Sequence, residues 1–146
     1  MRPATDRRLP LGSVTGAVTR SRAFTAEVLA DWGWLPAAAG GERRAVADDV
    51  LLVVSELVTN AVRHGGGRIE LRLRPSPPGL RVEVSDGSTE PPVLRYDDDP
   101  AVPGRHGLRV VALLSWDWGS VPAAGGKTVW SEIAAPPAAA AGRRPD

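Results

Sequence analysis

The chain has 146 residues, of which 42% are hydrophobic, and this is enough for one domain with a single core rather than for several domains. The 18 basic and 17 acidic side chains leave a formal net charge of +1, so no large net field attracts nucleic acid or an acidic membrane. The chain contains no cysteine, which excludes disulfides, thiolate metal sites and cysteine nucleophiles and agrees best with a reducing cytosol.

No stretch of the sequence has the character of a secretory signal or a membrane span. The longest unbroken strongly apolar run is residues 50–54, and the earlier stretch 9–18 is interrupted by proline, glycine and hydroxyl residues. We therefore expect a cytoplasmic protein without membrane contact. The polar residues 1–7 and the Ala/Pro-rich residues 134–146 predict disordered ends, which leaves residues 8–133 as the folded domain.

The period of the apolar residues predicts a strand, two helices, two strands, a third helix and two more strands. In chain order the predicted ranges are 8–11, 14–29, 42–64, 68–74, 80–85, 107–114, 116–121 and 127–133. Ser13 or Thr15 is the expected N-cap of the first helix, and Gly33 lies near its expected end. Three glycines at 65–67 terminate the second helix.

The two central strands alternate apolar and charged residues, which is typical of strands with one face in water. Residues 86–103 show no periodicity and contain four prolines, and a loop of this length in a small domain is a candidate lid. Together these elements predict an α+β fold, namely a two-layer α/β sandwich. Its sheet is expected to be mostly antiparallel or mixed and to be covered on one face by about three helices.

The second predicted helix carries an isolated charge. Residues 50–62 are apolar almost all the way around the helix, and Glu56 is the one charged residue among them. Asn60 lies four residues further, so both side chains share one stripe, with Arg63 beside it and His64 at its edge. A buried carboxylate must be paired, neutral or facing a polar cavity. Two interpretations stay open: a pocket with a base and a hard-cation ligand, or a solvated helix side with Glu56 bridged to an arginine.

Two further motifs suit a phosphate-containing ligand. Asp86-Gly87-Ser88 ends a predicted strand, where a carboxylate can accept from a planar amine such as an adenine amino group, although turns use the same residues. Gly104 and Gly107 precede a helix whose first amides could cradle phosphate oxygens. Residues 126–128 do not form a Walker loop, because Val121 stands where that pattern needs glycine and a strand follows. The two histidines lack the further ligands of a zinc centre.

The order of these motifs closely resembles the GHKL (Bergerat-fold) ATP-binding domain. The similarity is to the branch of bacterial anti-sigma factor serine/threonine kinases and their stand-alone regulatory relatives, and it covers roughly residues 9–133. It rests on four segments: SELVTNAVRH at 55–64, DGS at 86–88, GRHGL at 104–108 and GKTVWSEI at 126–133. Relatives usually carry a tighter Gly-x-Gly in the third segment, where Arg105 and His106 separate the glycines here.

The resemblance implies a role for each motif. Asn60 would hold Mg²⁺ between the phosphates of ATP, and Glu56 would be the base that orients the attacking hydroxyl. Asp86 would accept from the adenine amino group, with Ser88 nearby and Thr128 joining through a water. The backbone amides of 104–108 would face the triphosphate. The implied cofactor-binding residues are Asn60, His64, Asp86, Ser88, Gly104, Arg105, His106, Gly107, Leu108 and Thr128.

The resemblance also implies a function. The protein would be a Mg-ATP-dependent serine/threonine kinase that phosphorylates an anti-anti-sigma (STAS) partner and sequesters a sigma factor. An alternative is a nucleotide-binding regulatory module that uses ATP as a structural ligand, which the altered glycine motif favours. Relatives are commonly dimers, so a homodimer is one expectation. Direct nucleic-acid binding is not expected, because the charge is balanced and the polar stripe lies in an apolar helix.

Overall fold

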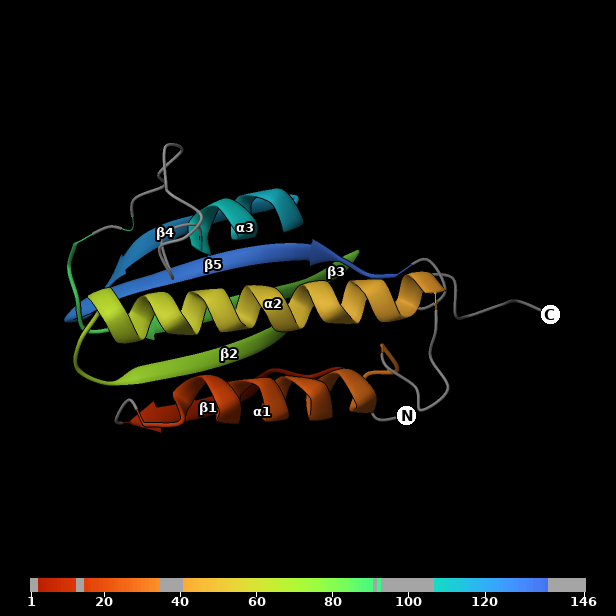
Figure 1. Cartoon of the computed structure of the whole chain (residues 1–146), viewed down its shortest axis with the longest axis horizontal. Helices are drawn as coiled ribbons and strands as arrows, with labels where there is room; N and C mark the ends of the chain where they lie inside the picture. Colours follow the sequence, from red (N-terminus) through yellow and green to blue (C-terminus); the bar gives the residue numbers. More distant parts are fainter. Residues whose placement is uncertain (1–2, 13–14, 35–40, 91, 93–106, 137–146) are drawn as a thin grey trace, which may run out of the picture.

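A five-stranded sheet with three helices on one of its faces forms the part of the chain that the structure describes (Figure 1). This structure is a computed structural model, and it describes residues 3–12, 15–34, 41–90, 92 and 107–136. The elements are β1 (Arg7–Gly12), α1 (Ala17–Asp31), α2 (Gly41–His64), β2 (Ile69–Ser76), β3 (Gly79–Asp86), α3 (Gly107–Leu114), β4 (Asp117–Ala123) and β5 (Gly126–Ala134). The predicted α+β sandwich is confirmed.

The strands follow the order β1-β2-β3-β5-β4, and each neighbouring pair is antiparallel. Alternation along β3 shows how the sequence sets the two faces. Leu80, Val82 and Val84 are buried toward the helices, whereas Arg81 and Glu83 lie on the other face. The sheet therefore has a helix-covered face and an open face, as the alternation predicted.

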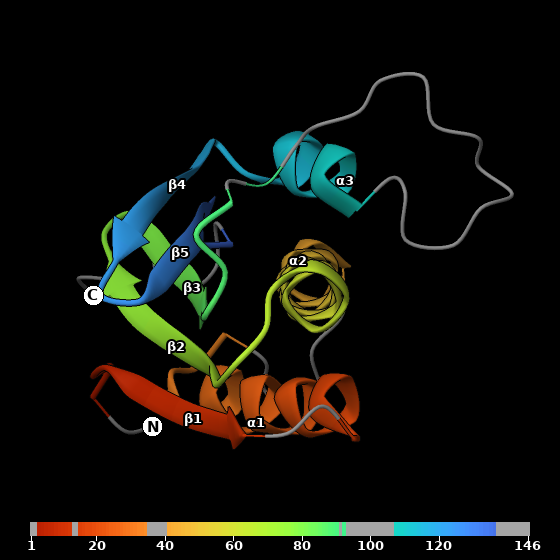
Figure 2. The same ribbon diagram turned by 90° about the vertical axis from the view of Figure 1, so that its left-hand side faces the viewer.

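The three helices lie side by side on the covered face, with α2 between α1 and α3 (Figure 2). The middle position of α2 explains its long apolar run, because the helix packs on the sheet and on both neighbours. The core residues of α2 are Ala47, Val50, Val53, Val54, Leu57, Val58 and Ala61. Val28 and Leu29 of α1 and Leu108 and Val111 of α3 complete the helix layer of the core.

The start of α1 differs from the prediction. Its N-cap is Gly16 and neither Ser13 nor Thr15, and no side-chain hydrogen bond caps the helix. Gly16 has φ 72°, a left-handed conformation that glycine adopts without strain. Thr15 therefore lies before the cap, and Ser13 lies outside the described residues. The end of α1 fits the prediction, because the helix stops at Asp31, two residues before Gly33.

Several predicted features fall outside the described residues. They include nearly all of the candidate lid and the tail from residue 137 onward, and residues 35–40 between the first two predicted helices are not described either. Within the described ranges, none of the helices combines the length and apolar character that crossing a membrane requires.

Candidate functional site

The polar stripe of α2 lies on the side of the helix that faces away from the sheet. Glu56 and Asn60 are both half-buried, and Leu52, one turn before Glu56, is 40% exposed. Residues 50–62 are therefore largely buried, as their apolar run indicates, except along this side. Apolar periodicity alone did not reveal that α1 and α3 leave an outer strip of α2 uncovered. Glu56 is thus accessible to a ligand.

Glu56 is not neutralised within the described part of the chain. No arginine among the described residues forms an ion pair with it, so the interpretation of a Glu56–arginine bridge finds no support there. A cation does reach the neighbouring position, because Arg22 of α1 donates from Nη1 to Ser55 Oγ at 2.8 Å. His64 is exposed at the last turn of α2.

The same side of α2 begins with a second carboxylate. Asp49 lies two turns before Glu56 and is partly buried. Burial raises the pKa of Asp49 above its ordinary value, and the neighbouring Asp48 raises it further by charge repulsion. Burial and like charge therefore make the ionised form of Asp49 less stable in the folded chain.

The end of α2, the end of β3 and the start of β5 lie at the same end of the sheet (Figure 1), and Asp86 is the last residue of β3. It is in phase with the inward residues Val82 and Val84 of β3, so its side chain points to the helix-covered face. Only 2% of that side chain is exposed. A carboxylate so well buried at a strand end needs fixed donors, and two are present.

Both donors bind the same oxygen of Asp86. Lys127 of β5 donates from Nζ to Oδ1 at 3.1 Å, and the backbone N–H of Ser88 donates to Oδ1 at 2.8 Å. Ser88 thus lies beside Asp86, and its own hydroxyl accepts from the backbone N–H of Glu90 at 3.1 Å. Lys127 was not predicted as a site residue. Asp86 and Lys127 are directly opposite each other in the β3–β5 ladder.

Glycines let the three backbones approach one another around Asp86, and we call Gly65, Gly87 and Gly126 the glycine collar. A methyl group at Gly65 would lie 2.6 Å from Asp86 Cγ, and one at Gly126 would overlap the Asp86 carbonyl oxygen. The backbone N–H of Gly87 donates to the Gly66 carbonyl at 2.6 Å. The glycines predicted only to stop a helix therefore also hold the strand end against it.

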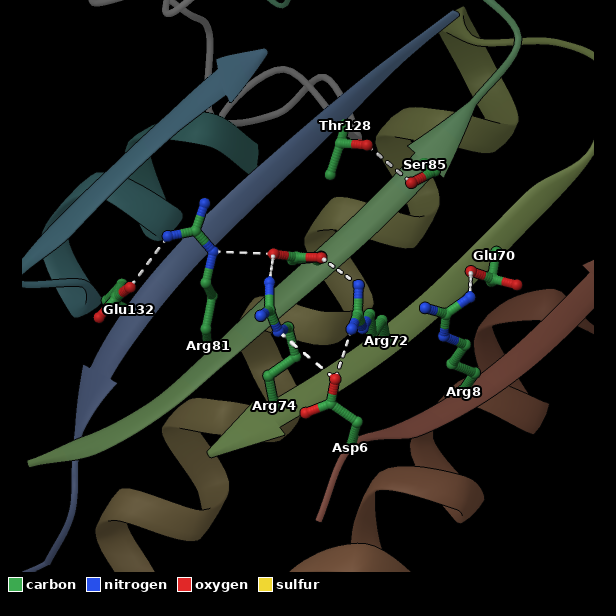
Figure 3. A network of polar contacts seen from close by, with 10 residues as sticks. Asp6, Arg8, Glu70, Arg72, Arg74, Arg81, Ser85, Thr128 and Glu132 are labelled. Atoms are coloured by element: carbon green, nitrogen blue, oxygen red, sulfur yellow. Dashed lines mark hydrogen bonds and ion pairs between the residues drawn. The ribbon is translucent and has the colours of Figure 1, made fainter. Parts of the chain in front are cut away.

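Thr128 does not share a face with Asp86. In the β3–β5 register Thr128 pairs with Ser85, one residue before Asp86, so its side chain points to the open face of the sheet. The two hydroxyl oxygens are hydrogen-bonded at 2.8 Å (Figure 3). The structure thus separates Thr128 from Asp86, and Lys127 occupies the position beside the carboxylate.

The predicted glycine motif is described only at its end. Gly104, Arg105 and His106 lie outside the described residues. Gly107 is the first residue of α3, and the side chain of Leu108 is buried in the core. Leu108 can therefore offer a phosphate group nothing but its backbone.

Magnesium suits the oxygen donors of the α2 stripe. The described residues contain no group of three or more His, Cys, Asp or Glu side chains that could hold a metal ion by themselves. Mg²⁺ in nucleotide sites commonly takes one or two protein oxygens and completes its shell with phosphate and water oxygens. The amide oxygen of Asn60, half-buried on this stripe, fits that donor set and leaves the Glu56 carboxylate free.

A two-layer sandwich with a polar stripe on its central helix and a buried carboxylate at a strand end is an architecture suited to nucleotide binding. The sequence matches the family model of the histidine kinase-like ATPase domain over residues 13–131, and the chain belongs to this family. Membership indicates an ATP-binding domain and confirms the predicted GHKL resemblance. None of the curated proteins compared with the chain is significantly similar to it.

Proposed function

We propose that this protein is a regulator of the anti-sigma factor type, which binds Mg-ATP, phosphorylates a serine or threonine of an anti-anti-sigma (STAS) partner and sequesters a sigma factor. The observation that carries the proposal is the placement of Glu56 and Asn60 four residues apart on one half-buried stripe of α2. The motif order described above supports the anti-sigma branch, and family membership supports the use of ATP.

The α2 stripe offers the two groups that phosphoryl transfer needs most. The Glu56 carboxylate would accept the proton of the substrate hydroxyl while that oxygen bonds to the γ-phosphorus of ATP and the bond from phosphorus to the β–γ bridging oxygen breaks, which releases ADP. Bound magnesium would neutralise phosphate charge, and Asn60 is the residue that would hold it. Because such catalysis is mainly positioning and charge stabilisation, a small domain is large enough for it.

Asp86 would fix the base of the nucleotide at the other end of the site. Its buried carboxylate is an acceptor held in one orientation by Lys127 and Ser88, which suits an amino group such as that of adenine. Calorimetric titration with ATP and GTP in magnesium tests this assignment. We expect a preference for ATP that Asp86→Asn reduces, and an equal affinity for both nucleotides would contradict the adenine assignment.

Phosphoryl transfer is tested by incubating the full chain with Mg-ATP and candidate STAS proteins and following phosphoserine and phosphothreonine by mass spectrometry. We expect Glu56→Gln to lower the rate by about 100-fold or more, the usual size of a general-base effect. Glu42→Gln is the matched control, because the same substitution then lies in the exposed first turn of the same helix.

The outcomes separate the two candidate functions. Equal phosphate incorporation by the wild type and Glu56→Gln would rule out Glu56 as the base. ATP binding without phosphate incorporation into any partner would favour the alternative, a regulatory module in which ATP is a structural ligand. Titration of Asn60→Ala with ATP, in magnesium and in EDTA, tests the metal assignment, because only the magnesium-dependent part of the affinity should fall.

A further inference from the structure

The ion pair of Asp86 and Lys127 is the most buried ion pair within the described residues. The two side chains are 2% and 8% exposed, and they lie on the helix-covered face of the sheet. Lys127 is also the single lysine of the chain, in which the other 17 basic residues are arginines. The chain therefore uses the compact ammonium of lysine at this one buried position, and the broader guanidinium of arginine at all its other basic positions.

Hydrogen bonding within this pair is incomplete. A lysine ammonium has three donors, and within the described part of the chain Lys127 uses one of them, toward Asp86 Oδ1. The carboxylate receives both of its described hydrogen bonds at Oδ1, so Oδ2 has acceptor capacity left. A buried pair of this kind gains little stability over apolar residues of the same size, whereas unused donors and acceptors suit a polar ligand.

The Asp86 carboxylate accepts hydrogen bonds and the neighbouring Lys127 ammonium donates them. A nucleotide base fits this pair when its edge carries a donor next to an acceptor. Adenine presents such an edge, because its exocyclic amino group donates next to ring nitrogen N1, which accepts. Guanine reverses the two, with an accepting O6 beside a donating N1, so the same pair would bind it only in a displaced position. Gly87, which follows Asp86, is exposed, so the backbone beside the pair is reachable from solvent at this point.

We propose that Lys127 is a specificity-determining residue that donates to N1 of adenine while Asp86 accepts from the neighbouring amino group. This inference rests on the proposed function, because it requires ATP to bind with its base at Asp86. Lys127 would then do two things at once: hold the carboxylate in place and provide the second hydrogen bond to the base.

Calorimetry with ATP and two analogues tests this contact on the ligand. In 1-deaza-ATP a C–H replaces N1, and in purine riboside triphosphate the amino group is missing. We expect each analogue to bind the wild type about tenfold or more weakly than ATP, the size of a lost hydrogen bond to a charged group. For Lys127→Met, ATP and 1-deaza-ATP should bind equally, while the loss for purine riboside triphosphate should persist because it depends on Asp86.

The matched control is Arg74→Met, which removes a cation from the opposite face of the sheet and should leave the ratio of ATP to 1-deaza-ATP affinity unchanged. Equal binding of ATP and 1-deaza-ATP to the wild type overturns the inference and needs no variant, so it decides even if Lys127→Met does not fold. A ratio in Lys127→Met equal to that of the wild type also overturns it. Absence of ATP binding to the wild type overturns the proposed function as well.

Discussion

Ion pairs lie on both faces of the sheet, and the two faces differ in how far water reaches the charges. On the covered face Lys127 and Asp86 form a pair whose side chains are 8% and 2% exposed, and Arg7 with Asp31 of α1 forms a second pair that is more exposed, at 27% and 23%. On the open face Asp6, Glu83 and Glu132 are linked to Arg72, Arg74 and Arg81 in a network across strands (Figure 3). Asp86 has one counter-ion and almost no water around it, so its charge depends on Lys127 more than a charge on the open face depends on any one partner.

The open face spreads each charge over several partners. Glu83 Oε2 accepts from Arg81 Nε at 2.9 Å and from Arg74 Nη1 at 3.1 Å, and Arg81 also stacks on Trp130 with its guanidinium carbon 4.1 Å from the ring centroid. The hydrogen bond from Arg72 to Asp6 raises the pKa of that guanidinium. Removal of one member leaves its neighbours with other partners and with water.

The largest effect is expected on the covered face. Lys127→Met leaves the Asp86 carboxylate buried without its counter-ion, which should lower the free energy of unfolding by about 3–5 kcal/mol. Urea denaturation followed by circular dichroism measures this loss. The double variant Asp86→Asn, Lys127→Met removes both charges and should recover most of the stability. A single variant as stable as the wild type would show that the pair is not buried in solution.

A substitution in the glycine collar should cause the second largest loss of stability. Gly126→Ala places a methyl group on the Asp86 carbonyl oxygen, so two backbones must separate, at a cost of about 2–3 kcal/mol. Gly125→Ala is the matched control, because its new methyl group meets open space and its φ of 71° costs only about 1 kcal/mol. Thermal unfolding of both variants measures the difference, and equal losses would mean that the close approach to Asp86 is unimportant.

The collar also shows what the sequence could and could not predict. The stop of α2 at Gly65 and the alternation along β3 are local features, so the pattern predicted both. The same alternation already places Asp86 inward with Val82 and Val84. The partner of Asp86 could not be predicted, because the β3–β5 register joins residues 41 positions apart. Only that register decides that Lys127 and not Thr128 faces the carboxylate.

The sequence left the exposure of Glu56 open between a pocket and a solvated helix side, for a related reason. The apolar run around α2 is explained by three packing partners, namely the sheet, α1 and α3. Periodicity gives the apolar faces of one helix and does not say how completely its neighbours cover them. The residue types of the stripe were informative in spite of this, because Glu56 and Asn60 stand out by their chemistry whatever their exposure.

Substitution of Glu83, the central carboxylate of the network on the open face, should reduce stability less. Glu83 is 12% exposed in its side chain, and Glu83→Gln should lower the free energy of unfolding by about 1–2 kcal/mol, because Arg74 and Arg81 keep their other partners. The loss should shrink at high salt, which screens exposed charges more than buried ones. Urea denaturation at low and high salt tests both points, and a loss as large as that of Lys127→Met would mean that the other partners on the open face do not compensate for the lost charge.

Loss of the exposed ion pair at the edge of the sheet should reduce stability least among the ion pairs compared. Arg8 and Glu70 are 3.9 Å apart, with side chains 55% and 38% exposed. Arg8→Ala should change the free energy of unfolding by at most about 0.5 kcal/mol, because water solvates both charges without the pair. Thermal unfolding measures this change. A loss above about 1 kcal/mol would mean that distance and exposure do not rank these pairs.

The smallest expected effect has the opposite sign and comes from a carboxylate with a like charge beside it. The pKa of Asp49 is raised by partial burial and then by Asp48, so the ionised group is less favourable in the folded chain than in the unfolded one. This penalty is complete at neutral pH and disappears as the pH falls through the raised pKa and below the ordinary value. Asp49→Asn should therefore stabilise the protein slightly at pH 7 and make no difference near pH 3, which urea midpoints at both values measure.

Asp48→Asn is the matched control and should give the smaller gain in stability, because repulsion is the lesser of the two causes that raise the pKa of Asp49. Destabilisation by Asp49→Asn at pH 7 would show that an oppositely charged partner stabilises ionised Asp49, as the arginines stabilise the carboxylates on the open face of the sheet.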